Sequence, residues 1–294
     1  MAIKRSLGSR VFDVANIIVL ALCATLTILP FIYCAAASLA TENEIATRPL
    51  FFFPHDVSFD AYKYIFSSNT ILKAAGNSVF ITLAGTAINM FMTLTMAYPL
   101  SKKYLHGRTF FLDIVIFSMF FGGGMIPTYI LVSNLGMLNT YWSVMIPGAI
   151  SAYNMMIVKN FFQEIPQELE ESARLDGCND MGALWRIVLP LSMPVIATFS
   201  LFYAVGHWNA YFDSMIYMQR AKEKWPLQVI LRQIIILSEM SAGDLSEMDP
   251  DFVEPPQQSV KMAVIVVSTV PIMMIYPFLQ KYFAKGVMVG ALKG

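Results

Sequence analysis

Six long apolar runs constrain the fold of this chain more than any other feature. A helix needs about 20 consecutive apolar residues to cross the hydrocarbon core of a bilayer. Runs of about that length lie near residues 14–36, 76–98, 110–132, 142–162, 192–212 and 260–279. Because lipid offers no partner for exposed backbone N–H and C=O groups, we expect these runs to be helical. We therefore predict an all-α membrane protein with six transmembrane helices in a single domain, residues 1–294.

The composition favours the same class. Hydrophobic residues make up 56% of the 294 residues and charged residues 14%, whereas soluble domains carry about 25% charged residues. The formal net charge is zero, so nothing indicates a nucleic-acid partner. Cys23, Cys34 and Cys178 have neither a disulfide spacing nor a metal-ligand spacing, and we predict no bound metal.

The positions of lysine and arginine predict the orientation in the membrane. Cytoplasmic loops are enriched in these residues. The chain has three such groups: Lys4, Arg5 and Arg10; Lys102, Lys103 and Arg108; and Lys281, Lys285 and Lys293. We therefore predict that both termini are cytoplasmic and that the run 14–36 is an uncleaved first span. The same arrangement puts the polar segment 163–190 in the cytoplasm and the segment 213–259 outside.

The cytoplasmic segment from Glu164 to Pro190 has the pattern of two short helices joined by a tight turn. Pro166 suits the first position of a helix, and the acidic residues that follow lie near the positive end of the helix dipole. Gly177 can adopt the left-handed conformation that ends a helix. Asn179 or Asp180 can cap the second helix, which we expect to stop at Pro190.

Fixed spacings within this segment carry a family resemblance. Glu171-Ser172-Ala173 is followed after three residues by Gly177, and after nine more by Ile187-Val188-Leu189-Pro190. The pattern resembles a motif of the membrane subunits of binding-protein-dependent ABC importers, with Ser172 in place of an alanine. The resemblance implies the ABC type I importer permease fold. It also implies an ATPase-coupling loop made of Glu170, Glu171, Ser172, Ala173, Arg174, Asp176, Gly177, Ile187, Leu189 and Pro190, in which the small residues permit close approach and the charged ones set the register.

The C-terminal sequence narrows the resemblance to carbohydrate importers. After Tyr282 and Phe283, the tail is similar to that of the second membrane subunit of the maltose importer and related oligosaccharide permeases. In that family the tail reaches the ATPase dimer. The resemblance therefore implies import of a sugar, with an oligosaccharide favoured, and an ATPase contact by Lys285, Gly286, Gly290 and Gly294.

The resemblance further implies partners and a location. The partners are a second homologous permease subunit, two copies of an ABC ATPase and an extracytoplasmic substrate-binding protein. The location is the cytoplasmic membrane of a bacterium or archaeon, which the chain crosses several times. The sequence holds no Gly-Lys-Ser/Thr phosphate loop, HExxH motif or nucleophile elbow. We therefore predict that the chain is not an enzyme and binds no cofactor, and that ATP and Mg²⁺ bind to the ATPase subunits.

Two other classes of membrane protein fit this sequence less well. An ion-coupled secondary transporter often shows paired repeats and ionisable residues at the bilayer midplane. The sequence shows no such repeat, and its ionisable residues lie near the ends of the apolar runs. An integral membrane enzyme would need a catalytic set of residues, and none is evident.

Polar residues in the second and fifth spans are candidates for a substrate path. A stripe on one face of the second span either hydrogen-bonds to neighbouring helices or lines the path; it consists of Thr82, Thr86, Asn89 and Thr93. A polar and aromatic cluster ends the fifth span, and it is either an interfacial belt or a surface that faces sugar. The path candidates are Asn89, His207, Trp208, Asn209 and Tyr211.

Three further segments carry expectations. Gly122-Gly123-Gly124 in the third span indicates either a bend or a close helix contact, since unwound backbone at membrane depth must be buried in protein or face a cavity. Residues 224–237 are amphipathic enough for an interfacial helix that starts near Pro226. The acidic stretch 239–254 that follows is expected to be an exposed loop. In the family this outer loop contacts the binding protein. The first outer loop, 38–75, either packs on the outer face or docks a partner.

Overall fold

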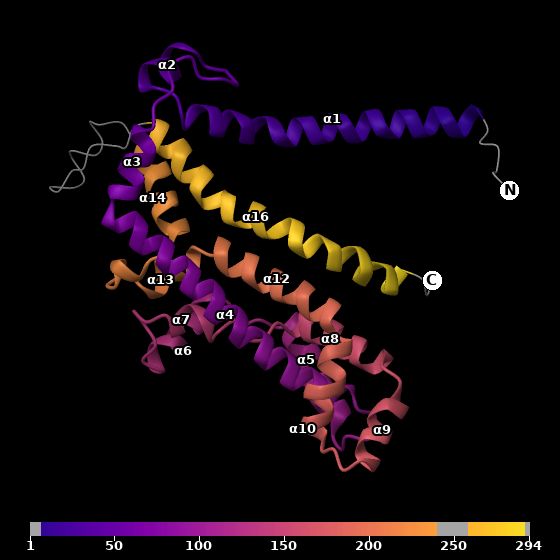
Figure 1. Ribbon diagram of the computed structural model, residues 1–294. Coiled ribbons are helices and arrows are strands. Elements are labelled where there is room, and N and C mark those ends of the chain that lie inside the picture. The colour runs from indigo at the N-terminus through magenta and orange to yellow at the C-terminus, as the bar shows by residue number, and fades with distance from the viewer. Residues whose placement is uncertain (1–6, 240–257, 292–294) are drawn as a thin grey trace. The chain divides into compact units, whose positions relative to one another are not determined.

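The computed structural model describes residues 7–239 and 258–291, which fold into helices joined by short connections (Figure 1). Within these two ranges there is no strand, and Ala40 and Val57 form an isolated antiparallel bridge. The α-helices are α1 (Leu7–Ala37), α2 (Glu42–Thr47), α3 (Asp60–Ser67), α4 (Asn69–Ser101), α5 (Arg108–Phe120), α6 (Met125–Asn134), α7 (Trp142–Met145), α8 (Ala152–Glu164), α9 (Gln167–Leu175), α10 (Asp180–Ala183), α11 (Leu189–Leu191), α12 (Met193–Asn209), α13 (Phe212–Tyr217), α14 (Leu227–Glu239) and α16 (Gln258–Ala291). Leu184–Val188 forms a π-helix and Lys222–Lys224 a 3₁₀-helix.

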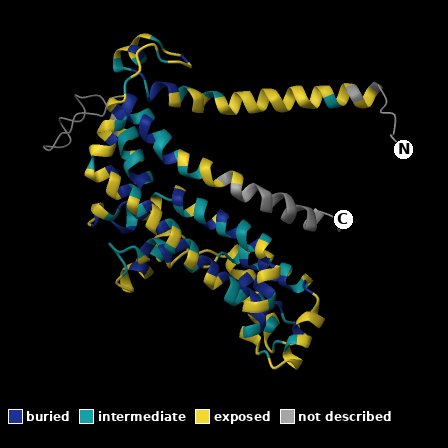
Figure 2. Cartoon of the chain, in the orientation of Figure 1, coloured by how far each residue is buried: buried dark blue, intermediate teal, exposed yellow. Residues whose placement is uncertain are grey.

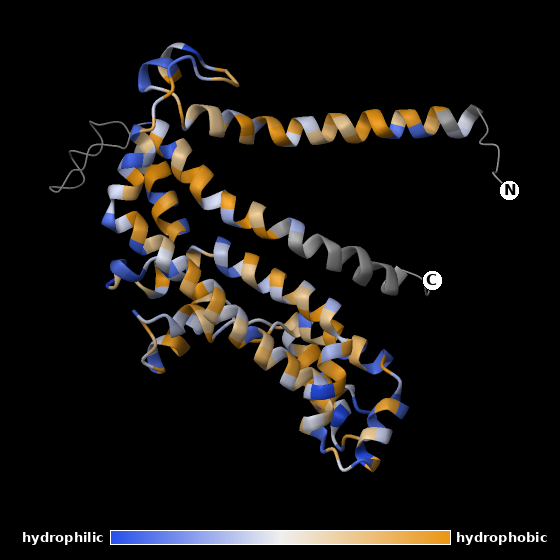
Figure 3. Cartoon of the chain, viewed as in Figure 1, coloured by the Kyte–Doolittle hydropathy of each residue, from blue (hydrophilic) through white to orange (hydrophobic). Residues whose placement is uncertain are grey.

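Helix α1 shows the membrane character of the chain most clearly. Its residues are exposed along nearly the whole length (Figure 2), and most of them are apolar (Figure 3). Phe12, Ile17 and Leu26 are each more than half exposed. Since fully burying one such side chain is worth about 1.5–3 kcal/mol, a helix of this composition is stable where lipid or another protein covers it.

Three of the predicted spans coincide with single long helices. Val11–Ala37, Asn69–Ser101 and Gln258–Ile275 are each long and apolar enough to cross a bilayer. They contain or overlap the predicted runs 14–36, 76–98 and 260–279. These helices, and up to five spans in all if two bent pairs each count as one, are what length and composition support in the described residues.

The other predicted runs contain breaks. In the run 110–132, α5 and α6 meet at 118°, and Gly124 has a φ of +82°, so the triple glycine marks a bend. The run 142–162 consists of the short helix α7, a non-helical connection and α8. The run 192–212 begins at an 84° bend between the helix ending at Leu191 and α12. The count of six transmembrane helices and the cytoplasmic position of both termini remain predictions.

The chain divides into two compact units, and the first comprises Met1–Asn69 and Leu231–Val270. In its described part, Phe51 packs with Ala36, Ala37 and Ala40 in a small core. The carboxylate of Glu44, in α2, accepts hydrogen bonds from the backbone N–H groups of His55 at 3.0 Å and Asp56 at 3.3 Å, both in the loop after α2. It also accepts a hydrogen bond from the Arg48 guanidinium at 2.5 Å. These bonds, led by that of His55, hold the pKa of Glu44 below its ordinary value.

The second unit comprises Thr70–Ile230 and Pro271–Gly294. Its apolar core forms where α4, α5, α8 and α12 meet the π-helix, with Ala97, Val115, Val158, Val188 and Phe199 among the buried residues. Helices α9 and α10 lie at the end of this unit where α5 and α8 also lie (Figure 1). The segment with the family spacings is therefore built onto the core of this unit.

Candidate functional site

Residues 167–191, hereafter the coupling segment, fold as the predicted helix, turn and helix. Helix α9 ends at a glycine turn, in which Gly177 has a φ of +84°. The N–H of Cys178 donates to the carbonyl of Ala173 at 2.9 Å, and that of Gly177 to the carbonyl of Arg174 at 3.0 Å. This is the bonding pattern of a glycine C-cap, which satisfies the last free carbonyls of a helix. Pro166 lies one position earlier than predicted, as the residue before α9.

The second helix of the coupling segment is fixed to the core. Asn179 caps α10, because its Oδ1 accepts the N–H of Gly182 at 2.8 Å. The chain then widens into the π-helix, in which the N–H of Leu189 donates to the carbonyl of Leu184. Pro190 has no N–H to offer the preceding turn, and it lies in the first turn of α11 rather than ending the helix.

The two ends of the family spacing have different surroundings. Leu184, Val188 and Leu189 belong to the apolar core, and Ile187 is half-buried. By contrast, Leu175 is 89% exposed and Trp185 57% exposed. Ser172 and Gly177 are also exposed, and Ala173 is half-buried. The coupling segment thus combines a fixed second helix with an exposed surface of large apolar and small residues.

Glu170 corrects one expectation from the sequence. It was predicted to be one of the charged residues that set the register with the ATPase, but it is 6% exposed and is the buried residue of α9. Lys102 Nζ donates to both carboxylate oxygens, at 2.6 Å from Oε2, and the Tyr98 hydroxyl donates to Oε2 at 3.1 Å. The reason is positional: Glu170 lies on the side of α9 that faces the end of α4, so its charge is paired within the chain. Glu171 and Asp176 remain exposed.

Arg174 ties α9 to its surroundings from the other side. Its guanidinium donates to the Tyr104 hydroxyl and, at 2.6 Å, to Asp180 Oδ1, and it lies over the Tyr104 ring at 5.2 Å from the centre. The hydrogen bonds to Tyr104 and then Asp180 raise the pKa of Arg174 above its ordinary range. Two of the four charged residues of the predicted coupling loop, Glu170 and Arg174, therefore make contacts within the chain.

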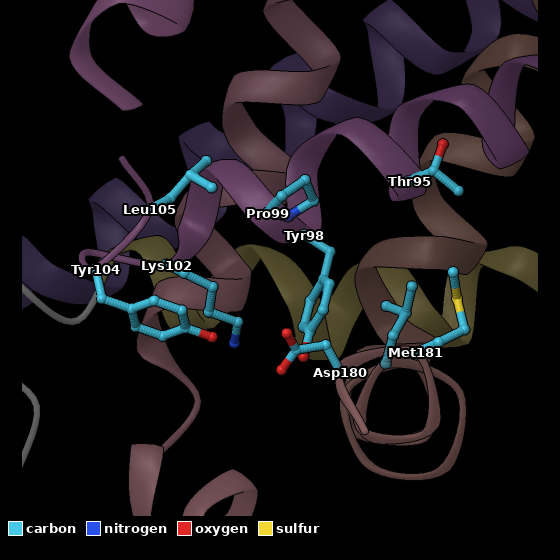
Figure 4. Close-up of a pocket in the computed structure, with 9 residues that line it drawn as sticks. Thr95, Tyr98, Pro99, Lys102, Tyr104, Leu105, Asp180 and Met181 are labelled. Atoms are coloured by element: carbon cyan, nitrogen blue, oxygen red, sulfur yellow. The ribbon is translucent and has the colours of Figure 1, made fainter. Parts of the chain in front are cut away.

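A cavity of about 260 Å³ lies between the end of α4 and the start of the second helix (Figure 4). Tyr98, Lys102 and Tyr104 line it from α4 and the loop that follows, and Asp180 and Met181 from α10. These contacts were not predictable from the sequence. Lys102 indicates only the orientation of the chain, and Tyr98 and Tyr104 carry no signal, because they lie 72 and 70 residues before their partners Glu170 and Arg174.

Two of the predicted path residues meet in a partly buried junction. His207 Nε2 lies 2.6 Å from Asn89 Oδ1, and the Asn89 amide donates to the carbonyls of Gly148 at 2.7 Å and Ala149 at 3.0 Å. A Cβ at Gly85 would lie 2.5 Å from the His207 ring, so only glycine fits there. Asn89 and His207 therefore hold α4, α12 and the break before α8 together.

The polar stripe on α4 has two different halves. Thr93 shares a 2.9 Å hydrogen bond with the Tyr203 hydroxyl, so this half, with Asn89, makes the interhelical bonds that were one of the two alternatives. The hydroxyl oxygens of Thr82 and Thr86 are buried without a hydrogen-bond partner among the described residues. The other alternative, a path lining, stays open for them.

The remaining path candidates separate from this junction. Trp208 lines an apolar cavity of about 220 Å³ in the second unit, together with Thr82, Leu201 and Ile275. Asn209 is exposed, and Tyr211 packs against the core formed by Met218, Trp225 and Val229. The structure thus places the five candidates in at least three different environments.

Two further predictions fall on residues whose side chains or backbone the structure leaves undescribed. Lys285, Gly286 and Gly290 lie in the backbone of α16, beyond its described side chains, and Gly294 lies outside the described residues. Most of the acidic stretch 239–254 lies outside them as well. The contact of the tail with an ATPase and the exposure of the acidic stretch stay predictions.

The chain is similar to known proteins over nearly its whole length. Residues 4–289 match the model of the family described as binding-protein-dependent transport system inner membrane component. The chain belongs to that family. It is 54% identical to Protein LplC of Bacillus subtilis (strain 168), covering 98% of this chain and 96% of that protein. It is 50% identical to the polygalacturonan/rhamnogalacturonan transport system permease protein YtcP of the same organism, covering 97% of this chain and 99% of that protein.

A solved structure agrees with the family and with the fold. The match is to a crystal structure of a bacterial ABC transporter involved in the import of the acidic polysaccharide alginate. It has a TM-score of 0.86 and 33% identity and covers 95% of this chain and 99% of the other. The chain is therefore a permease of the binding-protein-dependent ABC importers, an inner membrane component. Such a permease is a non-catalytic transport subunit, and separate ATPase subunits hydrolyse ATP.

Proposed function

We propose that this chain is one of two permease subunits of an importer that carries an oligosaccharide into the cytoplasm. A second homologous permease completes the pathway, two ATPase subunits bind ATP and Mg²⁺, and an extracytoplasmic binding protein delivers the sugar. The complex lies in the cytoplasmic membrane of a bacterium or archaeon. In this arrangement the chain crosses the membrane six times, its termini and its coupling segment are cytoplasmic, and the segment 213–259 is outside.

The exposed surface of the coupling segment carries the proposal. Leu175 leaves 89% of its surface uncovered in the chain by itself, although it belongs to a helix of glutamates and other polar residues. A cover on Leu175 would remove apolar area from water, worth about 1.5–3 kcal/mol for a leucine. The nearby small residues Ser172, Ala173 and Gly177 let a partner come close. We propose that an ATPase subunit is the partner that buries Leu175.

The geometry of the segment suits the transfer of movement. The second helix is packed into the core through Leu184, Val188 and Leu189, and α12 follows it in the chain after an 84° bend. A rigid displacement of α9 and α10 by a closing ATPase dimer would therefore displace membrane helices as well. Rigid-body shifts of packed helices are a common way to switch between two states. The switch here is between a cavity open to the cytoplasm and one open to the outside.

The choice of an oligosaccharide rests on the relatives. YtcP is named for polygalacturonan and rhamnogalacturonan, and the alginate transporter is named for an acidic polysaccharide. Both names concern complex polysaccharides, and the similarity to both covers nearly the whole of this chain. We therefore propose oligosaccharides derived from a complex polysaccharide. The hydrogen bond between the buried Asn89 and the half-buried His207 argues against these two residues as sugar contacts in the state described.

Two measurements test the proposal. Co-purification of the tagged chain from its host membrane should recover an ABC ATPase and a second permease, and recovery of neither would remove the importer assignment. Uptake of galacturonan and alginate oligosaccharides into cells should then be compared between the wild type and Gly177→Asp. Uptake and ATP hydrolysis that both match the wild type in Gly177→Asp would contradict the role of the coupling segment while leaving the importer assignment intact.

A further inference from the structure

We propose that the ion pair between Lys102 and Glu170 makes α4 a second route for movement from the coupling segment into the membrane helices. The proposal rests on the proposed function, since it assumes that an ATPase moves α9. It adds a route that does not follow the chain, and it gives Lys102, Glu170 and Tyr98 a positioning role.

The first step is the burial of the pair. The side chains of Lys102 and Glu170 are 12% and 8% exposed. Lys102 Nζ bonds both carboxylate oxygens and also lies 4.4 Å from the centre of the Tyr98 ring, while the Tyr98 hydroxyl bonds the same carboxylate. A carboxylate that leaves water must be paired and hydrogen-bonded, and this one is held by two groups from the end of α4.

A buried ion pair resists the separation of the two elements that carry its charges. If one partner is removed from a buried pair, a charge stays buried without compensation, which is strongly unfavourable. A small displacement of α9 from α4 that admits no water would likewise leave both charges buried and unpaired. The pair therefore holds α9 against α4 in one register, and the two elements are expected to move together.

Helix α4 is hydrogen-bonded to the membrane helices further along its length. At its end, the carbonyls of Leu100 and Ser101 accept hydrogen bonds from Arg108 at 2.9 Å and from Gln163 of α8 at 3.1 Å. About two turns earlier, Thr93 shares a hydrogen bond with the Tyr203 hydroxyl of α12. Further along, Asn89 bonds His207 and the carbonyls before α8. A displacement applied at Lys102 thus reaches α8 and α12 through one continuous helix.

The route along the chain is less direct by comparison. Between α9 and α12 it passes the glycine turn at Gly177, the π-helix and an 84° bend at residue 192. Each of these is a departure from a regular helix. Helix α4, by contrast, is one helix of 33 residues, in which Pro99 removes a single backbone hydrogen bond. The non-covalent route is therefore better suited to carry movement to the junction around Asn89.

The experiment uses the complete complex of both permeases, ATPases and binding protein in lipid nanodiscs. Hydrogen exchange is measured by mass spectrometry with and without a non-hydrolysable ATP analogue and Mg²⁺. In the wild type, nucleotide should change exchange in peptides of α9 and in α4 around residues 85–98. In Glu170→Gln and Lys102→Met, the response of α9 should persist and that of α4 should be lost. The exchanged pair Lys102→Glu with Glu170→Lys should restore it.

A matched control separates the pair from the general loss of a carboxylate on α9. Glu168 is exposed on the same helix, so Glu168→Gln should respond as the wild type does. If the α4 response persists unchanged in Glu170→Gln, the inference is wrong, whatever happens to transport. Glu170→Gln keeps the shape of the side chain and an acceptor for Tyr98, so it remains informative if Lys102→Met fails to assemble. A wild type that recovers no ATPase would instead contradict the proposed function itself.

Discussion

Two polar, aromatic segments of the second unit differ in how much of their side-chain surface the chain itself covers. The coupling segment leaves Leu175 and Trp185 largely exposed. Residues 208–225, hereafter the edge segment, bury Trp208, Tyr217 and Trp225. In the edge segment, Trp225 Nε1 donates to the carbonyl of Met218 at 2.9 Å. The same residue types thus serve internal packing in one segment and remain available in the other.

The edge segment is also fastened to distant parts of the chain. The Asn77 amide donates to the carbonyls of Glu223 at 2.9 Å and Trp225 at 3.0 Å. Asn139, with a φ of +61°, donates its backbone N–H to the carbonyl of Tyr217 at 2.8 Å. Its own carbonyl accepts a hydrogen bond from Lys224. The contrast teaches that exposure, rather than residue type, separates a surface that needs a partner from one that is already complete.

The largest expected effect comes from a matched pair of tryptophan substitutions. Trp225 is 8% exposed and Trp185 is 57% exposed. Trp225→Ala should destabilise the permease by about 3–5 kcal/mol, as for other buried aromatic residues, whereas Trp185→Ala should stay within about 0.5 kcal/mol of the wild type. Thermal unfolding of the purified chain in detergent, followed by size-exclusion chromatography, measures both. Equal losses of stability would show that the two segments do not differ as described.

Substitution of Leu175, unlike that of Trp225, should weaken binding of the ATPase rather than destabilise the permease. Leu175→Asn removes an apolar side chain that the isolated chain does not cover, so the melting temperature of the permease alone should hardly change. Its affinity for the ATPase should fall by about 1.5–3 kcal/mol, the value of burying a leucine. Titration of the ATPase against permease in nanodiscs measures this change. An unchanged affinity would place the ATPase contact elsewhere on the chain.

Gly177 allows conformation to be separated from close approach. Valine strongly disfavours a positive φ, so Gly177→Val should cost about 1–3 kcal/mol through strain and displace α10 relative to α9. Asparagine tolerates the left-handed region, and within the chain nothing lies within 4 Å of a Cβ placed at Gly177. Gly177→Asn should therefore leave the permease alone intact.

The transport assay then decides between the two roles of Gly177. If uptake in Gly177→Asn falls as it does in Gly177→Val, a partner must approach Gly177 closely. If uptake in Gly177→Asn equals that of the wild type, the glycine is needed for its conformation alone, and the close-approach role assigned to it would have to be withdrawn.

The smallest effect concerns Glu44, whose charge is satisfied within the chain as the polar groups of the edge segment are. Because the pKa of Glu44 is lowered on folding, its stabilising contribution is complete above the ordinary carboxyl pKa of about 4.3. It is lost as the pH falls through the lowered value in the folded chain. Hydrogen exchange of residues 42–58 should therefore accelerate as the pH falls below about 4.3, after correction for intrinsic rates. Glu44→Gln should abolish this dependence, and its persistence in the variant would assign it to another group.

The sequence alone was enough for the class of the protein, the family and the turn at Gly177. Length and apolarity define a membrane helix because the bilayer thickness and the need to pair backbone groups leave few alternatives. The helix–turn–helix was predictable because its signals are local: Gly177 adopts a positive φ, and Asn179 caps the next helix. The triple glycine likewise indicated one of two outcomes, and the structure shows the bend.

The partners of particular side chains were decided only by the tertiary structure. Nothing in the pattern around Glu170 distinguishes it from Glu171, yet one is buried against Lys102 and the other is exposed. Nor does the stripe on α4 reveal that Asn89 would meet His207, 118 residues further along the chain. Helical periodicity says which residues share a face, but it does not say which helix that face will meet. That depends on how the helices of the unit pack together, and the packing is set by the whole core rather than by any one segment.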